Sequence, residues 1–260
     1  MYENKFNKAP AGYGVGEWAG YSYNIGIGCS HNCRYCYARS FFVQEMLVPS
    51  NEAWTTERPK HQKSNIHLQA DKRVMFPSTH DISPAYLEVY CQALYNILAA
   101  GNEVLLVSKP HLECIKHICA EFQAFKTQME FRFTIGSINQ EVTAFWEPGA
   151  PTPEERISCL KYATEKGYQT GISMEPILEG KDAAIETFYA LSPLTTGTIW
   201  IGTMNNLDER VDQTIPEVVA AVQKIKELQV DEEMVQLYAF LKDEPQVRWK
   251  DSIKKVVQFL

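Results

Sequence analysis

The chain has 260 residues, of which 45% are hydrophobic, so it can bury a sizeable core and is not intrinsically disordered. Its net charge of −7 argues against a surface built for non-specific binding of nucleic acid. The first residues lack the apolar stretch of a signal peptide, and no run reaches the ~18 apolar residues that span a bilayer, so we expect a cytoplasmic protein without a membrane partner.

Short β-branched or aromatic runs alternate with longer segments of helical period. Strands are expected at 21–27, 73–77, 103–108, 131–137, 169–174 and 198–203. Helices are expected at 39–48, 83–100, 111–126, 153–166, 181–191 and 214–228. Strand-then-helix units in series predict parallel strands with right-handed crossovers. Six such units are too few for a closed eight-stranded barrel, so we predict an α/β fold with a partial TIM barrel, (β/α)6.

The last part of the sequence has apolar Met234, Leu237 and Leu241 at helical spacing, which predicts a short helix, and a second helix is expected near 250–259. We interpret this part as a short C-terminal helical cap rather than a separate domain. The predicted organisation is an N-terminal extension over 1–19, a core over 20–213, and a C-terminal helical extension over 214–260 that packs on the core.

In folds of this type, functional loops lie at the carboxyl ends of the parallel strands. The residues at these places are 29–36, 78–81, 109, 137–139, 175 and 204–206. The first of these segments, GCSHNCRYCYAR, holds Cys29, Cys33 and Cys36 in a C-x3-C-x2-C spacing. Seven cysteines in a chain expected inside the cell favour metal binding or burial over a disulfide framework.

Three closely spaced thiolates suit an iron–sulfur cluster, because they are soft ligands and a short loop can wrap one cubane. They leave one of the four irons open to a small molecule. Structural zinc is the competing interpretation, and it needs four ligands. Cys114 and Cys119 lie in one expected helix and point roughly 140° apart, and His31 lies awkwardly inside the tight loop. The cysteines outside the motif are expected in the core: Cys91, Cys114, Cys119 and Cys159.

With Tyr35 before its third cysteine and its place after the first expected strand, the motif resembles that of the radical S-adenosylmethionine (SAM) superfamily. CSHNCRYCYAR, the later VSKP, and WEPGAPTPEERISCLKYATEKGY are similar to the spore photoproduct lyase-like branch of that superfamily. The resemblance implies a [4Fe–4S] cluster held by Cys29, Cys33 and Cys36, with SAM at the open iron. It further implies reductive cleavage of SAM to a 5′-deoxyadenosyl radical. An electron donor such as flavodoxin or ferredoxin is the implied partner.

The resemblance also implies contacts with SAM near the cysteines and after the second strand. Tyr35 matches an aromatic residue that lies against the adenine of SAM; a tyrosine that merely packs the loop is the alternative. Ser78 and Thr79 stand where many relatives hold the amino group of SAM with a Gly-Gly-Glu-like stretch. This sequence has Pro-Ser-Thr-His-Asp instead, so hydroxyls, backbone carbonyls and Asp81 are the groups available there.

Three further strand ends carry candidate SAM contacts. Lys109 would pair with the carboxylate of SAM, with a surface lysine as the alternative. Ser137 would contact the ribose or the carboxylate, with a simple turn as the alternative, and Glu175 would accept a ribose or amino hydrogen bond. By contrast, we expect Glu147 and Arg156 to form a salt bridge that fixes a proline-rich loop, outside the site.

The favoured function is a radical SAM enzyme that acts on an unidentified small or medium-sized substrate, because little of the chain extends beyond the core. Repair of a thymine photodimer in DNA is an alternative. The hydrogen-donating cysteine of such relatives has no counterpart near residues 76–84, where His80 stands, and the one cationic stretch, 58–73, is interpreted as a solvated loop. A non-catalytic zinc or iron–sulfur binding module is the alternative of another class.

Overall fold

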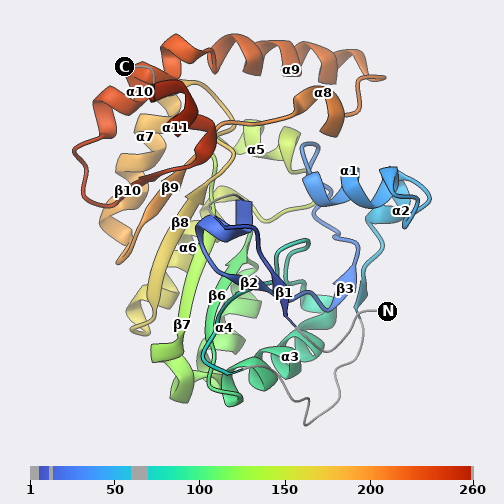
Figure 1. Ribbon diagram of the computed structural model, residues 1–260, viewed down its shortest axis with the longest axis vertical. Coiled ribbons are helices and arrows are strands. Elements are labelled where there is room, and N and C mark those ends of the chain that lie inside the picture. The colour runs from blue at the N-terminus through green and yellow to red at the C-terminus, as the bar shows by residue number, and fades with distance from the viewer. Residues whose placement is uncertain (1–5, 12–13, 60–69, 259–260) are drawn as a thin grey trace.

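The computed structural model describes residues 6–11, 14–59 and 70–258. Within these residues, one sheet has eight strands in the order β1-β2-β5-β6-β7-β8-β9-β10 (Figure 1). β1 pairs antiparallel with β2, and each following pair is parallel. The strands are β1 (Asn7–Lys8), β2 (Tyr21–Ser22), β5 (Arg73–Phe76), β6 (Glu103–Ser108), β7 (Met129–Thr134), β8 (Gln169–Met174), β9 (Ile199–Ile201) and β10 (Val247–Trp249). The prediction of an α/β fold with a largely parallel sheet is confirmed.

Helices connect the parallel strands, as the alternating pattern predicts (Figure 1). The α-helices are α1 (Tyr37–Gln44), α2 (Asn51–Trp54), α3 (Leu87–Ala99), α4 (Leu112–Glu121), α5 (Gln140–Trp146), α6 (Pro153–Glu165), α7 (Lys181–Leu191), α8 (Leu207–Arg210), α9 (Pro216–Leu228), α10 (Asp231–Leu241) and α11 (Asp251–Val257). The short helices α2, α5 and α8 were not predicted, because so few residues show no helical period. No described helix has the length and apolar character that crossing a bilayer requires.

The first expected strand, 21–27, is divided in the structure. Tyr21–Ser22 joins the main sheet as β2, whereas β3 (Gly26–Ile27) pairs antiparallel with β4 (Arg58–Pro59) in a separate two-stranded sheet. The backbones approach so closely that a Cβ on Gly26 would lie 2.6 Å from the Cα of Pro59, so glycine is required there. The cysteine loop therefore follows this small sheet, and the prediction that it directly follows a main-sheet strand is wrong.

The C-terminal segment contributes to the main sheet as well as to the helices above it. α10 and α11 agree with the expected helices, but β10 lies between them, with Val247 in register with Ile199 of β9. The prediction of a helical cap did not include this strand, because three residues are too few for an alternating pattern to show. The division at residues 19 and 213 stays a prediction. Residues 60–69, the centre of the cationic stretch, lie outside the described residues.

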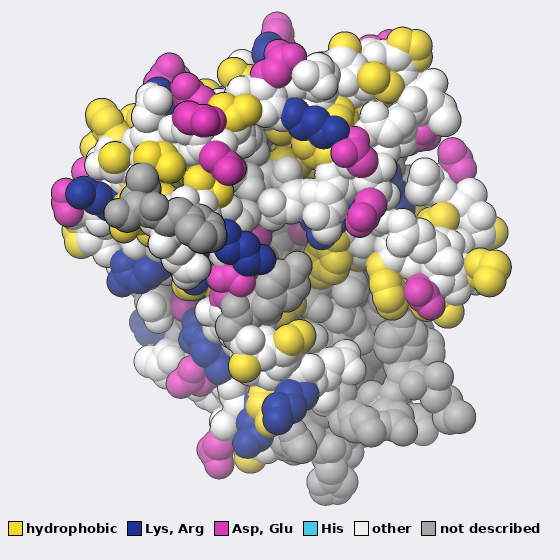
Figure 2. All heavy atoms as spheres, turned by 45° about the horizontal axis from the view of Figure 1, so that its top comes forward, with side chains coloured by type: hydrophobic (Ala, Val, Ile, Leu, Met, Phe, Trp, Pro, Cys, Tyr) yellow, Lys and Arg dark blue, Asp and Glu magenta, His cyan; other side chains and the backbone are white. Residues whose placement is uncertain are grey.

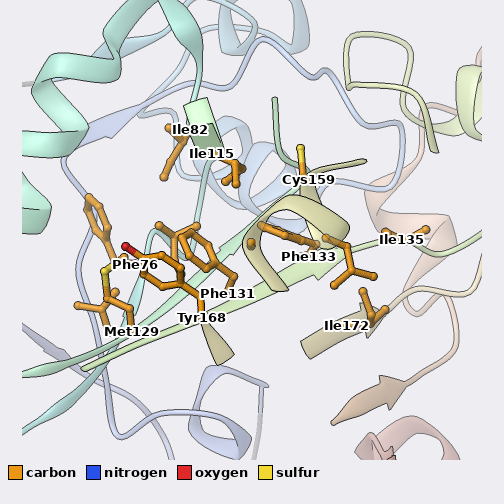
Figure 3. Close-up of a cluster of buried hydrophobic side chains, with 14 of the residues drawn as sticks. Phe76, Ile82, Ile115, Met129, Phe131, Phe133, Ile135, Cys159, Tyr168 and Ile172 are labelled. Atoms are coloured by element: carbon orange, nitrogen blue, oxygen red, sulfur yellow. The ribbon is translucent and has the colours of Figure 1, made fainter. Parts of the chain in front are cut away.

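Alternate residues of the central strands point to opposite faces of the sheet. Phe131 and Phe133 of β7 join the large apolar core under the helices (Figure 3). Between and after them, Arg132 and Thr134 face the other side. The cysteines outside the loop are buried in α3, α4 and α6, which confirms their predicted place: Cys91, Cys114, Cys119 and Cys159. The helical face of the sheet is thus an apolar core, and the opposite face is free to carry polar chemistry.

Candidate functional site

A cavity of about 570 Å³ lies at the carboxyl ends of the strands, over the polar face of the sheet. It brings together the predicted site residues Cys29, Cys33, Tyr35, Cys36, Ser78, Thr79, Lys109 and Glu175. Ser137 does not line it. The Ser137 hydroxyl donates to Glu179 Oε2 (2.5 Å) and accepts from the amide of Asn139 (2.9 Å). A contact between Ser137 and SAM stays a prediction.

The three cysteines come from one loop on one wall of the cavity. Cys29 and Cys33 are 5% and 6% exposed, and Cys36 caps α1 by accepting the amide of Arg39 at its Sγ (3.4 Å). Burial first, and then Asp81 and the other two thiols, raise the pKa of Cys29 well above its usual range. Burial raises the pKa of Cys33 to about 12 although Lys109 opposes it. A bound metal group would supply the positive charge that these thiols need in order to ionise.

The positions of the ligand atoms bear on which metal group the cysteine loop can hold. A tetrahedral zinc ion with Zn–S bonds of about 2.3 Å holds its sulfurs about 3.8 Å apart. Among the described side chains, the sets whose ligand atoms all lie within 4.8 Å of one another do not include the three loop cysteines together. At least one pair of these sulfurs is therefore more than 4.8 Å apart, and a donor set of three thiolates suits a cubane. Cys29 does lie in such a set with His31 and Asp81. The expectation that His31 is an awkward fourth ligand for an ion held by all three cysteines stays a prediction.

Asp81 links the cysteine loop to the ends of β5 and β6. Its Oδ1 accepts from Ser108 Oγ (2.9 Å) and from the amide of Lys109 (2.6 Å). Its Oδ2 lies 3.0 Å from His31 Nδ1 and 3.7 Å from Cys29 Sγ. Burial alone would raise the pKa of Asp81, but Lys109 and His31 outweigh it and hold that pKa well below its usual range. The place of Asp81 at the end of an expected strand was the feature of the sequence that pointed to this residue.

Lys109 is a buried cation at the cavity wall. Its side chain is 12% exposed, and its Nζ lies 4.0 Å from Asp81 Oδ2 and 5.7 Å from the centre of the Tyr35 ring. Burial lowers its pKa, but Cys33, Tyr35 and Asp81 prevail and raise it well above the usual range. The interpretation of Lys109 as a surface lysine is therefore wrong. Its position gives the cavity a permanent positive charge that can pair with a carboxylate.

Glu147 and Arg156 form an ion pair behind the cysteine loop, with Arg156 Nη2 2.5 Å from Glu147 Oε2. Both side chains are 1% exposed or less. The Tyr35 hydroxyl donates to Glu147 Oε1, which fixes the tyrosine ring at the cavity. Burial raises the pKa of Glu147, but Arg156 and Lys109 outweigh burial and lower it overall. The predicted salt bridge is confirmed.

The loop that this ion pair fixes binds the backbone of the cysteine loop. The amide of Arg34 donates to Trp146 O (2.8 Å), and the amide of Gly149 donates to His31 O (2.9 Å). A Cβ on Gly149 would lie 2.2 Å from Ser30 O, so only glycine fits at this crossing. The buried ion pair thus supports the loop that carries the three cysteines.

Asn24 shapes the turn after β5. Its Oδ1 accepts the amides of Ser78 (2.8 Å) and Thr79 (3.1 Å), and its Nδ2 donates to Ser78 Oγ (2.8 Å). The Tyr37 hydroxyl donates to Ser78 O. The Ser78 hydroxyl and carbonyl therefore already have partners within the protein. Thr79 also lines the cavity.

The cavity lining also contains Glu17 and Lys250, which are far apart in the sequence. Lys250 Nζ lies 3.2 Å from Glu175 Oε2, forms an ion pair with Glu17, and lies 4.3 Å from the centre of the Trp18 ring. The side chains of Lys250 and Glu17 are 4% and 3% exposed. Burial raises the pKa of Glu175, although Lys250 opposes it. Sequence reasoning missed Glu17 and Lys250, because neither belongs to a motif or follows an expected strand.

Comparisons with known proteins give relatives in sequence and in structure. No family model matches the chain. It is 26% identical over 170 residues to an uncharacterized protein of Acidianus two-tailed virus, and 25% identical over 170 residues to an uncharacterized protein of Methanocaldococcus jannaschii. These matches cover 61% and 62% of this chain, but 56% and 61% of the two relatives. The chain thus matches less than two thirds of the length of these relatives.

The structural matches cover more of the chain. Spore photoproduct lyase complexed with dinucleoside spore photoproduct matches with a TM-score of 0.61 at 16% identity, over 95% of this chain and 79% of that one. A mutant of that enzyme with bound AdoMet (SAM) matches with a TM-score of 0.59 at 16% identity, over 95% and 79%. Streptococcus suis SuiB bound to S-adenosylmethionine gives 0.54 at 9% identity, over 92% and 52%. The predicted resemblance is confirmed at the level of the fold: the chain has the fold of spore photoproduct lyase and SuiB.

Proposed function

We propose that the chain is a radical SAM enzyme that binds a [4Fe–4S] cluster through Cys29, Cys33 and Cys36 and reductively cleaves SAM. The observation that carries this proposal is the position of three sulfurs from one loop on the wall of a single cavity. The fold is that of proteins solved with SAM bound. When bound, the cluster supplies the electron, received from a donor such as flavodoxin or ferredoxin, that cleaves SAM to methionine and a 5′-deoxyadenosyl radical.

The side chains of the cavity have distinct roles in this proposal. The buried ammonium of Lys109 pairs with the carboxylate of SAM, since it is charged and 12% exposed at the wall. Tyr35, fixed by Glu147, lies against the adenine. The turn at Ser78 and Thr79 receives the amino group. Glu175, whose protonation burial favours, accepts or donates a hydrogen bond to the ribose.

The proposed architecture is a partial TIM barrel of the (β/α)6 type, with 1–19 as an extension and 214–260 packed on the core. In its support, seven strands of the main sheet are parallel, and helices follow most of them. We further propose a cytoplasmic location, since free cysteines such as Cys29, Cys33 and Cys36 suit a reducing compartment.

A small or medium-sized substrate is the proposed reactant. Glu17 and Lys250 form a buried ion pair in the lining of the same cavity of about 570 Å³, which supports a substrate of limited size. Among the described residues of the face shown in Figure 2, Lys and Arg side chains are interspersed with Asp and Glu. That mixture supports a substrate other than DNA. In the turn at 77–81, His80 is buried and its Nδ1 lies 3.1 Å from the Tyr90 hydroxyl, so this turn carries no thiol to donate hydrogen.

Anaerobic reconstitution with iron and sulfide tests the cofactor. We expect a brown protein with about four irons per chain that converts SAM to 5′-deoxyadenosine when a reductant is added. Single alanine variants of Cys29, Cys33 and Cys36 should lose the iron and the cleavage. Cys159→Ala is the matched control, because Cys159 is a buried cysteine outside the cavity that donates to Pro110 O (3.6 Å).

Two results would overturn parts of the proposal. A colourless protein that holds one zinc ion, lost on Cys29→Ala but retained on Cys33→Ala, would favour the mixed set of Cys29, His31 and Asp81 and a non-catalytic module. Reversal of dinucleoside spore photoproduct by the reconstituted enzyme would favour the DNA-repair alternative over a small substrate. The two measurements are independent, because the first concerns the cofactor and the second the substrate.

A further inference from the structure

A second group of metal-ligand side chains lies away from the cavity, between α3 and α4. It consists of Cys91 on α3 with His117 and Glu121 on α4, and their ligand atoms all lie within 4.8 Å of one another. None of the three lines the cavity. From this geometry we propose that the chain binds one zinc ion here, through the thiolate of Cys91, the imidazole of His117 and the carboxylate of Glu121. The inference is independent of the proposed radical SAM chemistry.

The two ligands on α4 have the spacing that a helix uses to chelate a metal. His117 and Glu121 are four positions apart, so their side chains project from the same face, and His117 Nε2 lies 2.9 Å from Glu121 Oε2. Both side chains are about half exposed, at 51% and 44%. They can therefore move by the fraction of an ångström that an ion between them requires, at little cost in packing.

The third ligand comes from the neighbouring helix and is held in place. Cys91 is 4% exposed within α3, so its sulfur has a fixed position at the base of the group. Ligands bound to tetrahedral zinc at about 2.0–2.3 Å lie about 3.3–3.8 Å apart. The present separations all lie within 4.8 Å, so zinc binding needs only small movements of the two exposed side chains, with His117 and Glu121 moving slightly apart from their present 2.9 Å. A water molecule completes the tetrahedron on the solvent side.

Charge and donor type favour zinc among divalent cations. The set offers one sulfur, one nitrogen and one oxygen, and zinc accepts all three. A thiolate and a carboxylate carry two negative charges, which balance the charge of one divalent cation with a neutral imidazole. Burial, and then the Glu121 carboxylate, raise the pKa of Cys91, so the thiol carries its proton before the metal arrives. Binding forms the zinc–sulfur bond, breaks the S–H bond and releases that proton to the buffer.

Zinc titration of the full chain tests the site. The cysteine loop is first replaced in a background variant, Cys29→Ala/Cys33→Ala/Cys36→Ala, so that it does not compete for zinc. We expect one zinc per chain and one proton released, seen as a dependence of the calorimetric heat on the ionisation enthalpy of the buffer. Cobalt should give a thiolate charge-transfer band. Cys91→Ala and His117→Ala each remove a direct ligand and should weaken zinc binding by about 100-fold or more, because mutating even the residues that orient metal ligands costs about 10–100-fold.

Two matched controls accompany the variants. Glu113→Gln removes an exposed carboxylate from the first turn of α4, and Cys159→Ala removes a buried cysteine from α6; both should leave zinc affinity unchanged. The proposal fails if Cys91→Ala binds zinc as tightly as the background variant, or if the cobalt complex lacks the thiolate band. Where the background variant does not fold, zinc retained by the iron-reconstituted parent is compared with that retained by reconstituted His117→Ala. Equal retention of zinc by these two proteins would also overturn the proposed site.

Discussion

Replacing Arg156 with methionine tests how the structure supports the cysteine loop. The Arg156 guanidinium forms an ion pair with Glu147 Oε2 at 2.5 Å and donates to two backbone carbonyls, Pro151 O at 2.8 Å and Thr134 O at 3.1 Å. Methionine has a comparable length but no donor. Arg156→Met therefore leaves a carboxylate that is fully buried without its cation. Removing one partner of a buried ion pair costs about 3–5 kcal/mol, so the free energy of unfolding should fall by that amount.

The double variant Glu147→Met/Arg156→Met separates the ion pair from packing. With both charges gone, neither partner is left buried and unpaired. The double variant should therefore lose less stability than the sum of the losses in the two single variants. We expect a coupling of about 2–3 kcal/mol. Urea unfolding, followed by circular dichroism and by fluorescence, gives the free energy of unfolding of the parent, the two single variants and the double variant. The single variants should also hold less iron after reconstitution, because the loop fixed by the pair binds His31 O through Gly149.

Two outcomes would refute this reasoning. One is additivity of the two single changes within about 0.5 kcal/mol, which would mean that the charges do not interact in the folded protein. The other is an Arg156→Met variant that loses stability as expected but binds iron at the parent level. In that case the pair would stabilise the fold without supporting the cysteine loop.

Three further changes test neighbouring parts of the site. Lys109→Met should weaken SAM binding about 10–100-fold, because a charged hydrogen-bond donor is lost; an unchanged Kd in calorimetry would contradict this role. Burial lowers the pKa of His80 to about 4, so its neutral form stabilises the fold at neutral pH. As pH falls from 6.5 to 4, the unfolded chain binds the proton before the folded one does, so the free energy of unfolding of the parent should fall by up to about 3 kcal/mol. If urea titrations show the same fall for His80→Gln, this explanation is contradicted. Gly149→Ala places a Cβ 2.2 Å from Ser30 O and should cost about 1–3 kcal/mol together with iron content, whereas Gly20→Ala, with nothing within 4 Å, should not.

The parts of the fold that the sequence predicts well are those with a long local pattern. The strand at 103–108 and the strand at 169–174 agree with the observed β6 and β8; the first has a continuous apolar run, Val104–Val107, and the second begins directly after the turn that ends the preceding helix. The expected strand at 21–27 failed, since the approach of Gly26 to Pro59 is a tertiary contact that no local pattern records. The same applies to β10, whose pairing with β9 joins distant segments.

The candidate site shows the same limit. The cysteine spacing and the rule of strand ends predicted side chains that do line one cavity, including Lys109 and Glu175. The strand-end rule also selected Ser137, whose hydroxyl is instead bound to Glu179. Glu17 and Lys250 reach the cavity from outside the predicted core, and their ion pair depends on how the chain ends meet. Such contacts follow from packing and carry no sequence signature of their own.

The ion pair of Lys250 with Glu17 also bears on the order in which the molecule is made. A ribosome releases Glu17 and the cysteine loop well before residue 250, and the N-terminal parts of a chain begin to fold first. Until Lys250 arrives, the Glu17 carboxylate stays in water, because burying it alone would cost several kcal/mol. The ion pair at the cavity can therefore form only after residue 250 has been synthesised. Until then the cavity lining beside the three thiols lacks Lys250 and the buried side chain of Glu17.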